Sequence, residues 1–422
     1  MKKLIALLLA CVMVLGLVAC GGNAPETTAP AADNTPETTA PAAPETITLK
    51  VWGPNEDQVD ANSFLPVACE KFDEAHPEWD IEFVYEVCAE GDAGGMVTKD
   101  PAAAADVFMF ANDQLGTLLQ SNAIARLGGS VLDQVMADNT ERMISTVSNG
   151  DAVYGVPFTI NTWFMYYDTS VYSEEDIKSL DAMMAIKPVA YQVTNTWYMP
   201  ALYYAVGGTM FGDGTDGSAG VKFSDEKCAA VTLYIADALA SGKMIDDQGG
   251  TGLDALRAGT VGAVFSGTWD AGNVKSALGD NYGAAAVPAI TINGESYQMT
   301  PFAGSKAFGV NPNSKNMAAA TALAAWLGSA EMQALHAELR KGEVQPIAKS
   351  LVEGAENADP AAVAQMDTFN NKSVYQPTIP EMGAYWTNAG SMGQALVNGE
   401  INAENAAAKT EEWNNGLNNA GL

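Results

Sequence analysis

Positive charge is what this sequence has least of. Its 422 residues include 21 lysines and arginines against 51 aspartates and glutamates, a formal net charge of −30 at pH 7. A surface this acidic repels nucleic acid and anionic lipid, so we expect neither as a partner. The sequence also has no local basic patch, which argues against an anionic solute.

Cysteine is scarce too. Of the five cysteines, two lie within the first 20 residues, which leaves Cys69, Cys88 and Cys228. An odd number cannot form a self-contained set of disulfides, and this spacing matches no zinc-binding pattern. We therefore expect buried free thiols, and a bridge between Cys69 and Cys88 is the alternative.

Histidines are few and catalytic motifs are missing. His76 and His336 are the only histidines, which nearly excludes a histidine-rich metal site. The chain has no Gly-x-Ser-x-Gly, Walker or His-Glu-x-x-His sequence. A glycosidase needs two carboxylates with tuned pKa values, and among 51 acidic residues no pair stands out. The sequence predicts a protein that is not an enzyme, with no metal and no cofactor.

Long apolar runs are absent except at the N-terminus. Two lysines precede an unbroken apolar run over residues 4–16, which is too short to span a bilayer and is typical of a signal peptide over residues 1–19. The following Leu-Val-Ala-Cys resembles a bacterial lipobox, in which Cys20 becomes the lipidated N-terminus. The alternative is an ordinary signal peptide cleaved after Ala19. We expect an extracytoplasmic protein that is lipid-anchored to the cell membrane at Cys20.

Residues 20–46 are rich in Pro, Thr, Ala and Glu. The eight-residue sequence at 25–32 recurs without change at 36–43. Such a segment has too little apolar surface to offset the entropy of ordering it, and its prolines favour an extended chain. The composition predicts a disordered tether that holds a folded body away from the membrane.

The body over residues 47–422 exceeds the usual size of one hydrophobic core, so two lobes are expected. Strand-like and helical segments alternate, which predicts open α/β sheets with ligands beyond the carboxyl ends of the strands. The expected strands cover residues 48–52, 81–87, 106–110, 261–265 and 283–287. The expected helices cover residues 68–74, 198–206, 226–239, 253–258, 318–339, 391–397 and 403–413, and a further helix begins at 115.

Four segments carry a resemblance to a known family. They are Phe-Ala-Asn-Asp-Gln-Leu-Gly at 110–116, residues 150–168 with Tyr-Gly-Val-Pro and Tyr-Tyr-Asp, residues 257–269 ending in Gly-Thr-Trp, and residues 377–386 ending in Ala-Tyr-Trp. Their order and spacing resemble the extracellular solute-binding proteins of ABC importers, in the branch that includes the maltose and maltodextrin binders. The resemblance covers nearly the whole body.

The resemblance implies a periplasmic-binding-protein-like fold of type II. In it, two discontinuous α/β lobes are joined by hinge crossings, here near residues 158–161, 302–308 and 346–353. The N-lobe would combine residues 47–159 with 303–350, and the C-lobe would combine 160–302 with 351–422. The implied protein is a monomer that captures a neutral oligosaccharide between its lobes and delivers it to the transmembrane subunits of a permease.

A sugar presents flat C–H patches that suit aromatic rings and hydroxyls that suit amides and carboxylates. By resemblance, the residues expected to stack on sugar rings are Phe110, Trp269, Tyr385 and Trp386, and those expected to hold hydroxyls are Asp113, Gln114 and Asn161. Weaker aromatic candidates are Trp163, Trp197 and Tyr198, and Asn55, Glu56 and Asp57 follow the first strand on the N-lobe side. The alternative for the aromatics is packing in a core, which we expect of Trp79, Trp326 and Trp413.

Two of the polar candidates also suit a purely structural role, and some depart from the maltose-binding pattern. Asp113 is also placed to cap the following helix, and Asn161 to satisfy hinge backbone groups. Gln114 stands where a basic residue is common, Asn161 replaces a glutamate, and no lysine appears in the turn after Trp52. These differences leave the particular sugar open.

Three other functions stay open at this point. In the first, the solute would be another glycan. In the second, it would be ferric ion held by adjacent tyrosines, which occur at 166–167 and 203–204. The third possibility is a surface adhesin that binds glycans without transporting them.

Overall fold

The structure is a computed structural model that describes residues 45–340, 344–352 and 359–419. The expected signal peptide, Cys20 and nearly all of the tether lie outside the described residues. The first strand begins at Glu45, two residues before the expected start of the body. Within the described residues no helix has the length and apolar character needed to cross a membrane.

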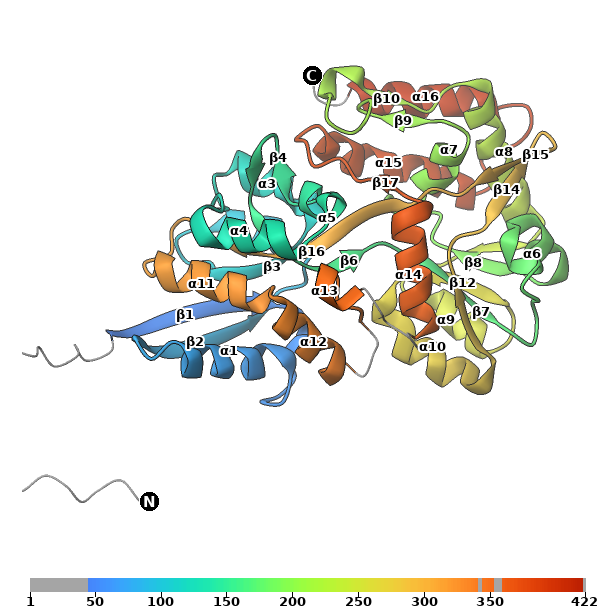
Figure 1. The fold of residues 1–422 in the computed structure, drawn as a ribbon. Coiled ribbons are helices and arrows are strands. Elements are labelled where there is room, and N and C mark those ends of the chain that lie inside the picture. Colours follow the sequence, from blue (N-terminus) through green and yellow to red (C-terminus); the bar gives the residue numbers. More distant parts are fainter. Residues whose placement is uncertain (1–44, 341–343, 353–358, 420–422) are drawn as a thin grey trace, which may run out of the picture. The chain divides into compact units, whose positions relative to one another are not determined.

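One group of elements, the N-lobe, is built on a six-stranded sheet (Figure 1). Three parallel strands run in the order β2, β1, β3, and β16 pairs antiparallel with β3 on one side and with β6 on the other. The bounds are β1 (Glu45–Gly53), β2 (Trp79–Val87), β3 (Val107–Ala111), β6 (Gly155–Asn161), β16 (Phe302–Val310) and the short β17 (Val374–Tyr375) beside the start of β16. A small hairpin joins β4 (Ser148–Asn149) to β5 (Ala152–Val153).

The N-lobe helices are α1 (Phe64–Ala75), α2 (Ala93–Lys99), α3 (Leu115–Gln120), α4 (Gly129–Asp138), α5 (Glu141–Ser145), α11 (Met317–Leu327) and α12 (Ala330–Leu339). The single helix expected over 318–339 is therefore two helices. Ser329 separates them because its hydroxyl accepts a hydrogen bond from the Met332 amide and so caps α12.

The C-lobe is built on a five-stranded sheet in the order β11, β8, β12, β7, β13. Its strands are β7 (Phe164–Asp168), β8 (Val189–Tyr191), β11 (Met244–Asp246), β12 (Ala263–Ser266) and β13 (Tyr282–Ala285), with two hairpins of β9 (Thr209–Met210) and β10 (Val221–Lys222) and of β14 (Ala289–Ile292) and β15 (Glu295–Gln298). Its helices are α6 (Leu180–Ile186), α7 (Pro200–Ala205), α8 (Glu226–Ala240), α9 (Thr251–Arg257), α10 (Ala271–Leu278), α14 (Pro360–Asn371), α15 (Met382–Val397) and α16 (Ala406–Asn419).

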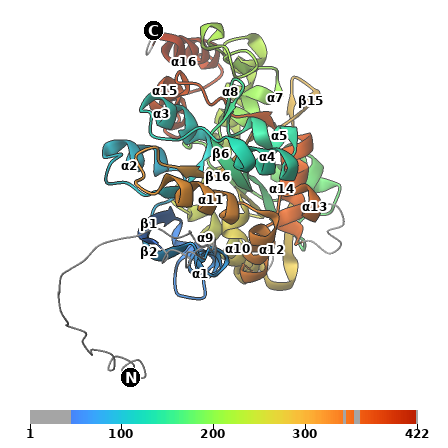
Figure 2. The same cartoon turned by 60° about the vertical axis from the view of Figure 1, so that its left-hand side comes forward.

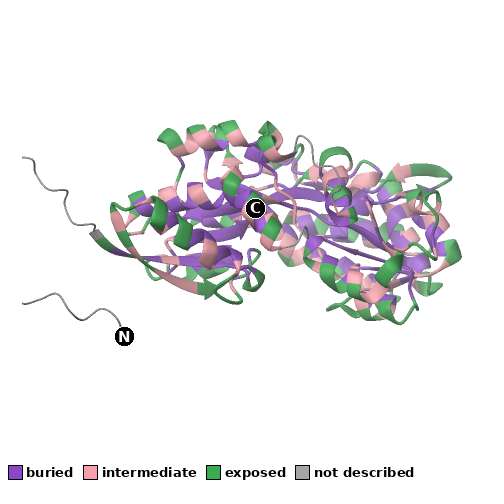
Figure 3. Ribbon diagram, turned by 60° about the horizontal axis from the view of Figure 1, so that its bottom comes forward, coloured by how far each residue is buried: buried purple, intermediate pink, exposed green. Residues whose placement is uncertain are grey.

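Each lobe has its own hydrophobic core, and the buried residues follow the central strands while the exposed ones lie on the helices (Figure 3). Trp413 is buried in the C-lobe core, and Trp79 and Trp326 pack against the N-lobe core, as expected. The Trp326 indole also donates a 2.9 Å hydrogen bond to the Ala68 carbonyl of α1.

The two lobes are connected through their sheets, since β6 and β16 run from one lobe toward the other (Figure 1), and Figure 2 shows both strands in the middle of the folded body from a second side. Only Thr162 and Trp163 separate β6, in the N-lobe sheet, from β7, in the C-lobe sheet. On β16, Phe302 belongs to the C-lobe core and Phe308 to the N-lobe core. The boundaries expected at 159/160 and 302/303 thus fall inside β6 and β16. The third connection joins α12 to α14, and its described part includes α13 (Lys349–Val352).

The cysteines of the described residues are free and buried, as expected, and the alternative bridge is not formed. Cys69 lies on α1 and Cys88 follows β2. Burial raises the pKa of the Cys69 thiol to about 12 and that of Cys88 to about 11. These thiols therefore act as packing groups and not as nucleophiles.

Candidate functional site

A cavity of about 410 Å³ is lined by residues from both lobes and from the strands that connect them. The N-lobe residues follow the carboxyl ends of β2 and β3, where ligands of open α/β sheets bind. The lining residues are Glu90, Gly91, Ala111 and Asp113 from the N-lobe, Asn161 and Lys306 from the connecting strands, and Thr196, Trp197, Trp269 and Trp386 from the C-lobe.

Three tryptophans form the aromatic part of this lining. Trp269 follows β12 and remains 36% exposed, and its ring centroid lies 6.1 Å from that of Trp197. The Trp197 indole is fixed by a 2.7 Å hydrogen bond to the Gln376 amide oxygen. Trp386 lies on α15 and packs edge-on against Phe302. Three held indoles therefore face the same cavity.

Asp113 supplies a carboxylate to the cavity. Its Oδ2 accepts a 2.9 Å hydrogen bond from the Gln114 amide, while its Oδ1 is buried without a partner among the described residues. Burial raises the pKa of Asp113 to about 6, although the Gln114 hydrogen bond opposes the rise. Gln114 does not line the cavity but holds Asp113 in place. The N-cap residue of α3 is Gln114, whose side chain makes no capping hydrogen bond.

A charged pair in the cavity was not among the residues expected from the sequence. Lys306 on β16 lies 2.7 Å from the Glu90 carboxylate, and its ammonium lies 5.6 Å from the ring centroid of Trp269. Both side chains are largely buried. The signals were available, because Glu90 follows an expected strand and Lys306 falls in an expected crossing. The cavity is thus more charged than its departures from the maltose-binding pattern suggested.

Asn161 lines the cavity at the end of β6 and is buried. Its backbone pairs with that of Gly304 on β16. Asn161 therefore lies on the strand that leads from the N-lobe sheet toward the C-lobe sheet.

The three residues expected after the first strand differ in where their side chains lie. Asn55 is exposed and lines no described cavity, whereas Glu56 and Asp57 line a smaller space that shares Glu90, Trp269 and Lys306 with the cavity. Asp57 itself is buried and bonds His336 at 3.0 Å and Arg340 at 3.2 Å on the α12 side. Burial would raise the pKa of Asp57, but His336 and Arg340 outweigh it and lower that pKa. Asp57 thus fastens η1 (Asn55–Asp57) to α12 and is already satisfied.

Four expected sugar-stacking residues are in the cores instead, so their placement in the cleft is corrected: Phe110, Trp163, Tyr198 and Tyr385. Every residue of β3 is buried, and the Phe110 ring packs against Gly155 in the N-lobe. The Tyr385 hydroxyl donates a 2.8 Å hydrogen bond to the Thr196 carbonyl.

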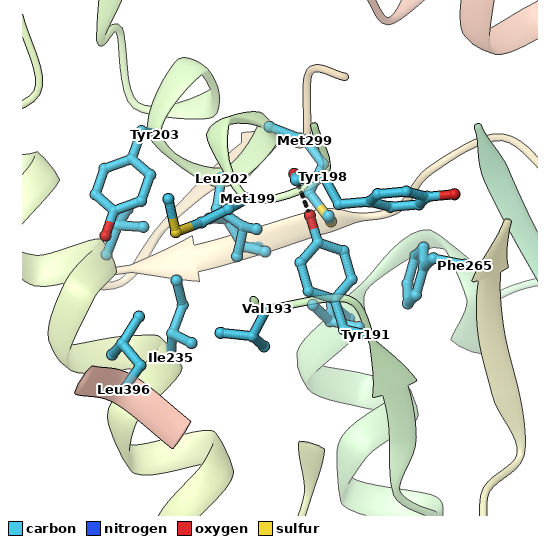
Figure 4. Packing of buried hydrophobic residues seen from close by; sticks show 14 of the residues in the cluster. Tyr191, Val193, Tyr198, Met199, Leu202, Tyr203, Ile235, Phe265, Met299 and Leu396 are labelled. Carbon is cyan, nitrogen blue, oxygen red and sulfur yellow. Dashed lines mark hydrogen bonds between the residues drawn. The ribbon is translucent and has the colours of Figure 1, made fainter. Parts of the chain in front are cut away.

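Trp163 and Tyr198 stack on each other at 4.8 Å inside the C-lobe. Figure 4 shows Tyr198 among its buried neighbours, with the Tyr191 hydroxyl donating to its carbonyl. Twice in the C-lobe, the aromatic residue next to a cavity tryptophan is buried in the core: Tyr198 beside Trp197 and Tyr385 beside Trp386.

Comparison with known proteins decides the family. The profile of a family described as bacterial extracellular solute-binding protein matches residues 68–365. The chain belongs to this family. This solute-binding protein also has the two α/β lobes of its structural neighbours, so the expected fold is confirmed.

Several relatives and solved structures are similar over most of the chain. A galactooligosaccharide-binding protein of Bacillus subtilis is 27% identical over 73% of this chain and 75% of its own length. A maltooligosaccharide ABC transporter solute-binding lipoprotein of Streptococcus pneumoniae is 27% identical over 72% of this chain and 74% of its own length. A solved structure with acarbose has a TM-score of 0.85 and 47% identity, covering 88% of this chain and 99% of its own.

The tyrosine pairs of this solute-binding protein are not arranged for a metal. Tyr166 and Tyr203 are fully buried, and their hydroxyls bond the Gly267 carbonyl and the Thr232 hydroxyl. Burial raises the pKa of both phenols, because it disfavours the phenolate that would bind ferric ion. None of the four tyrosines lines the cavity.

Proposed function

We propose that this protein is the substrate-binding subunit of an ABC importer and that it captures a neutral oligosaccharide between its lobes. The observation that carries the proposal is the cavity itself, with three tryptophans opposite the unpaired carboxylate oxygen of Asp113. Indole faces suit the C–H patches of a pyranose ring, and a carboxylate accepts hydrogen bonds from its hydroxyls. The volume of about 410 Å³ lies within the range of small-molecule sites, about 300–1,000 Å³.

The similar proteins favour a maltodextrin-like ligand. Their names specify maltooligosaccharide and galactooligosaccharide, and the structure at 47% identity was solved with acarbose. The charge in the cavity does not conflict with a neutral ligand, since Glu90 and Lys306 pair with each other and the Asp113 carboxylate can accept a hydrogen bond from a sugar hydroxyl. A galactooligosaccharide is the second candidate, supported by the name of the Bacillus subtilis relative.

The remaining parts of the function follow from the same proposal. Sugar that contacts both lobes favours the closed arrangement, and the closed form docks on the transmembrane subunits of the permease. The protein acts as a monomer outside the cytoplasmic membrane, anchored by a lipid at Cys20, and performs no catalysis. The lipoprotein among its relatives supports the anchor.

Binding of free sugars by the purified protein tests the proposal. Calorimetry with maltotetraose, acarbose and a galactooligosaccharide should detect one saturable site for a maltodextrin-type ligand. Trp269→Ala and Trp386→Ala should each weaken binding by about 1–3 kcal/mol through lost apolar contact. The control Ile186→Ala, at an exposed apolar side chain on α6, should change nothing. Unchanged affinity in both tryptophan variants refutes the site, and binding to polysaccharide alone favours the adhesin.

The anchor has its own test. Incorporation of radiolabelled palmitate measures lipidation directly, with Cys20→Ala as the control. The wild type should take up the label and Cys20→Ala should not, because the Cys20 thiol is the proposed site of lipid attachment. Equal labelling of the two proteins, or no label in the wild type, would contradict lipidation at Cys20.

A further inference from the structure

A contact between the lobes lies beside the cavity. Its C-lobe side is the segment 377–381, between β17 and α15. Pro377 packs next to Gly214, Glu381 packs against Gly217, and Ile379 packs on the C-lobe core. The segment is therefore held in place by the C-lobe.

The N-lobe side of the contact is Gly116 on α3. Its neighbours Leu115 and Leu118 are fully buried in the N-lobe core, so the helix moves with that lobe. A Cβ atom built at Gly116 would lie 2.8 Å from the Thr378 carbonyl oxygen and 3.4 Å from that of Ile379. Backbone oxygens cannot swing away as a flexible side chain does, so any side chain here would push the lobes apart.

Glycine is otherwise a poor choice at this position. It costs a helix about 1 kcal/mol relative to alanine. The backbone of Gly116 is not in the left-handed region, so its conformation does not require glycine. What remains is the space that the carbonyls of the segment 377–381 occupy.

The contact is placed to set the width of the cavity. Gly116 follows Asp113 by three residues, and Trp386 lies on the helix that begins right after the segment 377–381. Asp113 and Trp386 face the cavity from opposite lobes. The distance between them is therefore governed by how closely α3 approaches the segment.

We propose that Gly116 is a positioning residue that lets the lobes close to the width at which the cleft grips a sugar. The inference rests on the proposed function and deepens it. The atoms nearest to a Cβ at 116 belong to Thr378 and Ile379, which do not line the cavity, yet a side chain there holds Asp113 and Trp386 too far apart for one ligand to contact both. The effect should grow from alanine to valine as the side chain grows.

The test compares Gly116→Ala and Gly116→Val with the wild type and with Gly95→Ala. The control lies on α2 of the same lobe, where an added Cβ meets nothing within 4 Å. For each purified protein we would measure the affinity for maltotetraose by calorimetry, the thermal midpoint without sugar, and the radius of gyration with and without sugar by small-angle X-ray scattering.

We expect Gly116→Val to weaken binding by at least about tenfold, the equivalent of one hydrogen bond lost across the cleft. Gly116→Ala should lie between Gly116→Val and the wild type, and both variants should compact less than the wild type on adding sugar. Their thermal midpoints without sugar should not fall, because the helix gains from replacing glycine. The control should bind and compact as the wild type does.

Two results overturn the inference in distinguishable ways. If the wild type binds and Gly116→Val binds and compacts equally well, the contact does not limit closure and the inference is wrong. If the wild type binds and compacts with none of the sugars, the proposed function fails, and the inference falls with it.

Discussion

Replacing Asp113 with asparagine should make the folded protein more stable and should weaken its binding of sugar. In the structure its Oδ1 is buried without a partner among the described residues, and only Gln114 bonds its other oxygen. A carboxylate in that setting is costly to ionise, because the water it loses on folding is not fully replaced. Asparagine keeps the shape and removes the charge.

The size of the effect follows from the pKa. The pKa of an ordinary aspartate side chain is 3.8, and burial raises the pKa of Asp113 to about 6. At about 1.36 kcal/mol for each tenfold change in proton affinity, ionised Asp113 lowers the free energy of unfolding by about 3 kcal/mol at neutral pH. Because the folded state binds the proton more tightly, this cost is absent below pH 3.8, grows as the pH rises toward 6, and stays constant above it.

Urea titrations of the wild type and Asp113→Asn at pH 4, 5, 6 and 7 measure this cost to the free energy of unfolding. The variant should gain up to about 3 kcal/mol at pH 7 and almost nothing at pH 4. Its affinity for maltotetraose at pH 7 should fall by about tenfold or more, since a charge-assisted hydrogen bond to a sugar hydroxyl is lost. A stability gain that is the same at pH 4 and pH 7, or no gain at all, would refute the argument.

Two further predictions concern residues outside the cavity. Cys69, Cys88 and Cys228 should not react with a thiol reagent at pH 8 until urea unfolds the protein, since burial raises the pKa of the first two to about 12 and about 11; rapid colour development in the native protein would contradict this. Tyr385→Phe should lower the free energy of unfolding by about 1 kcal/mol, because the Thr196 carbonyl loses its donor, and calorimetry should find sugar affinity within about twofold of wild type.

The fold was largely predictable because its patterns are local. The apolar run at 107–110 predicted a strand over residues 106–110, and β3 is buried at every position. The alternation at 81–87 predicted β2. The break at residues 328–329 was missed, since the alanine-rich sequence favours helix on both sides, although Gly328 ends α11 and the Ser329 hydroxyl caps α12.

The site was harder to predict because the local sequence does not determine whether a side chain points into the cavity or into the core. Trp269 and Trp386 line the cavity, yet Trp386 sits on a helix, where its neighbour Tyr385 necessarily points elsewhere. Phe110 resembles a stacking residue by motif and still belongs to a strand with both faces covered. Lys306 pairs with Glu90 across more than two hundred positions of sequence, a meeting that no spacing rule indicates.

The pairing of β16 with β3 also determines how late in synthesis the N-lobe sheet can be completed. β3 exposes an edge until residues 302–310 have left the ribosome, and the C-lobe lacks α15 and α16 until almost the last residue. Pairing between such distant segments folds slowly, because a long loop must close before any contact rewards it. We therefore expect that the N-lobe sheet of a nascent chain is not completed until β16 has been synthesised, after more than 300 of the 422 residues.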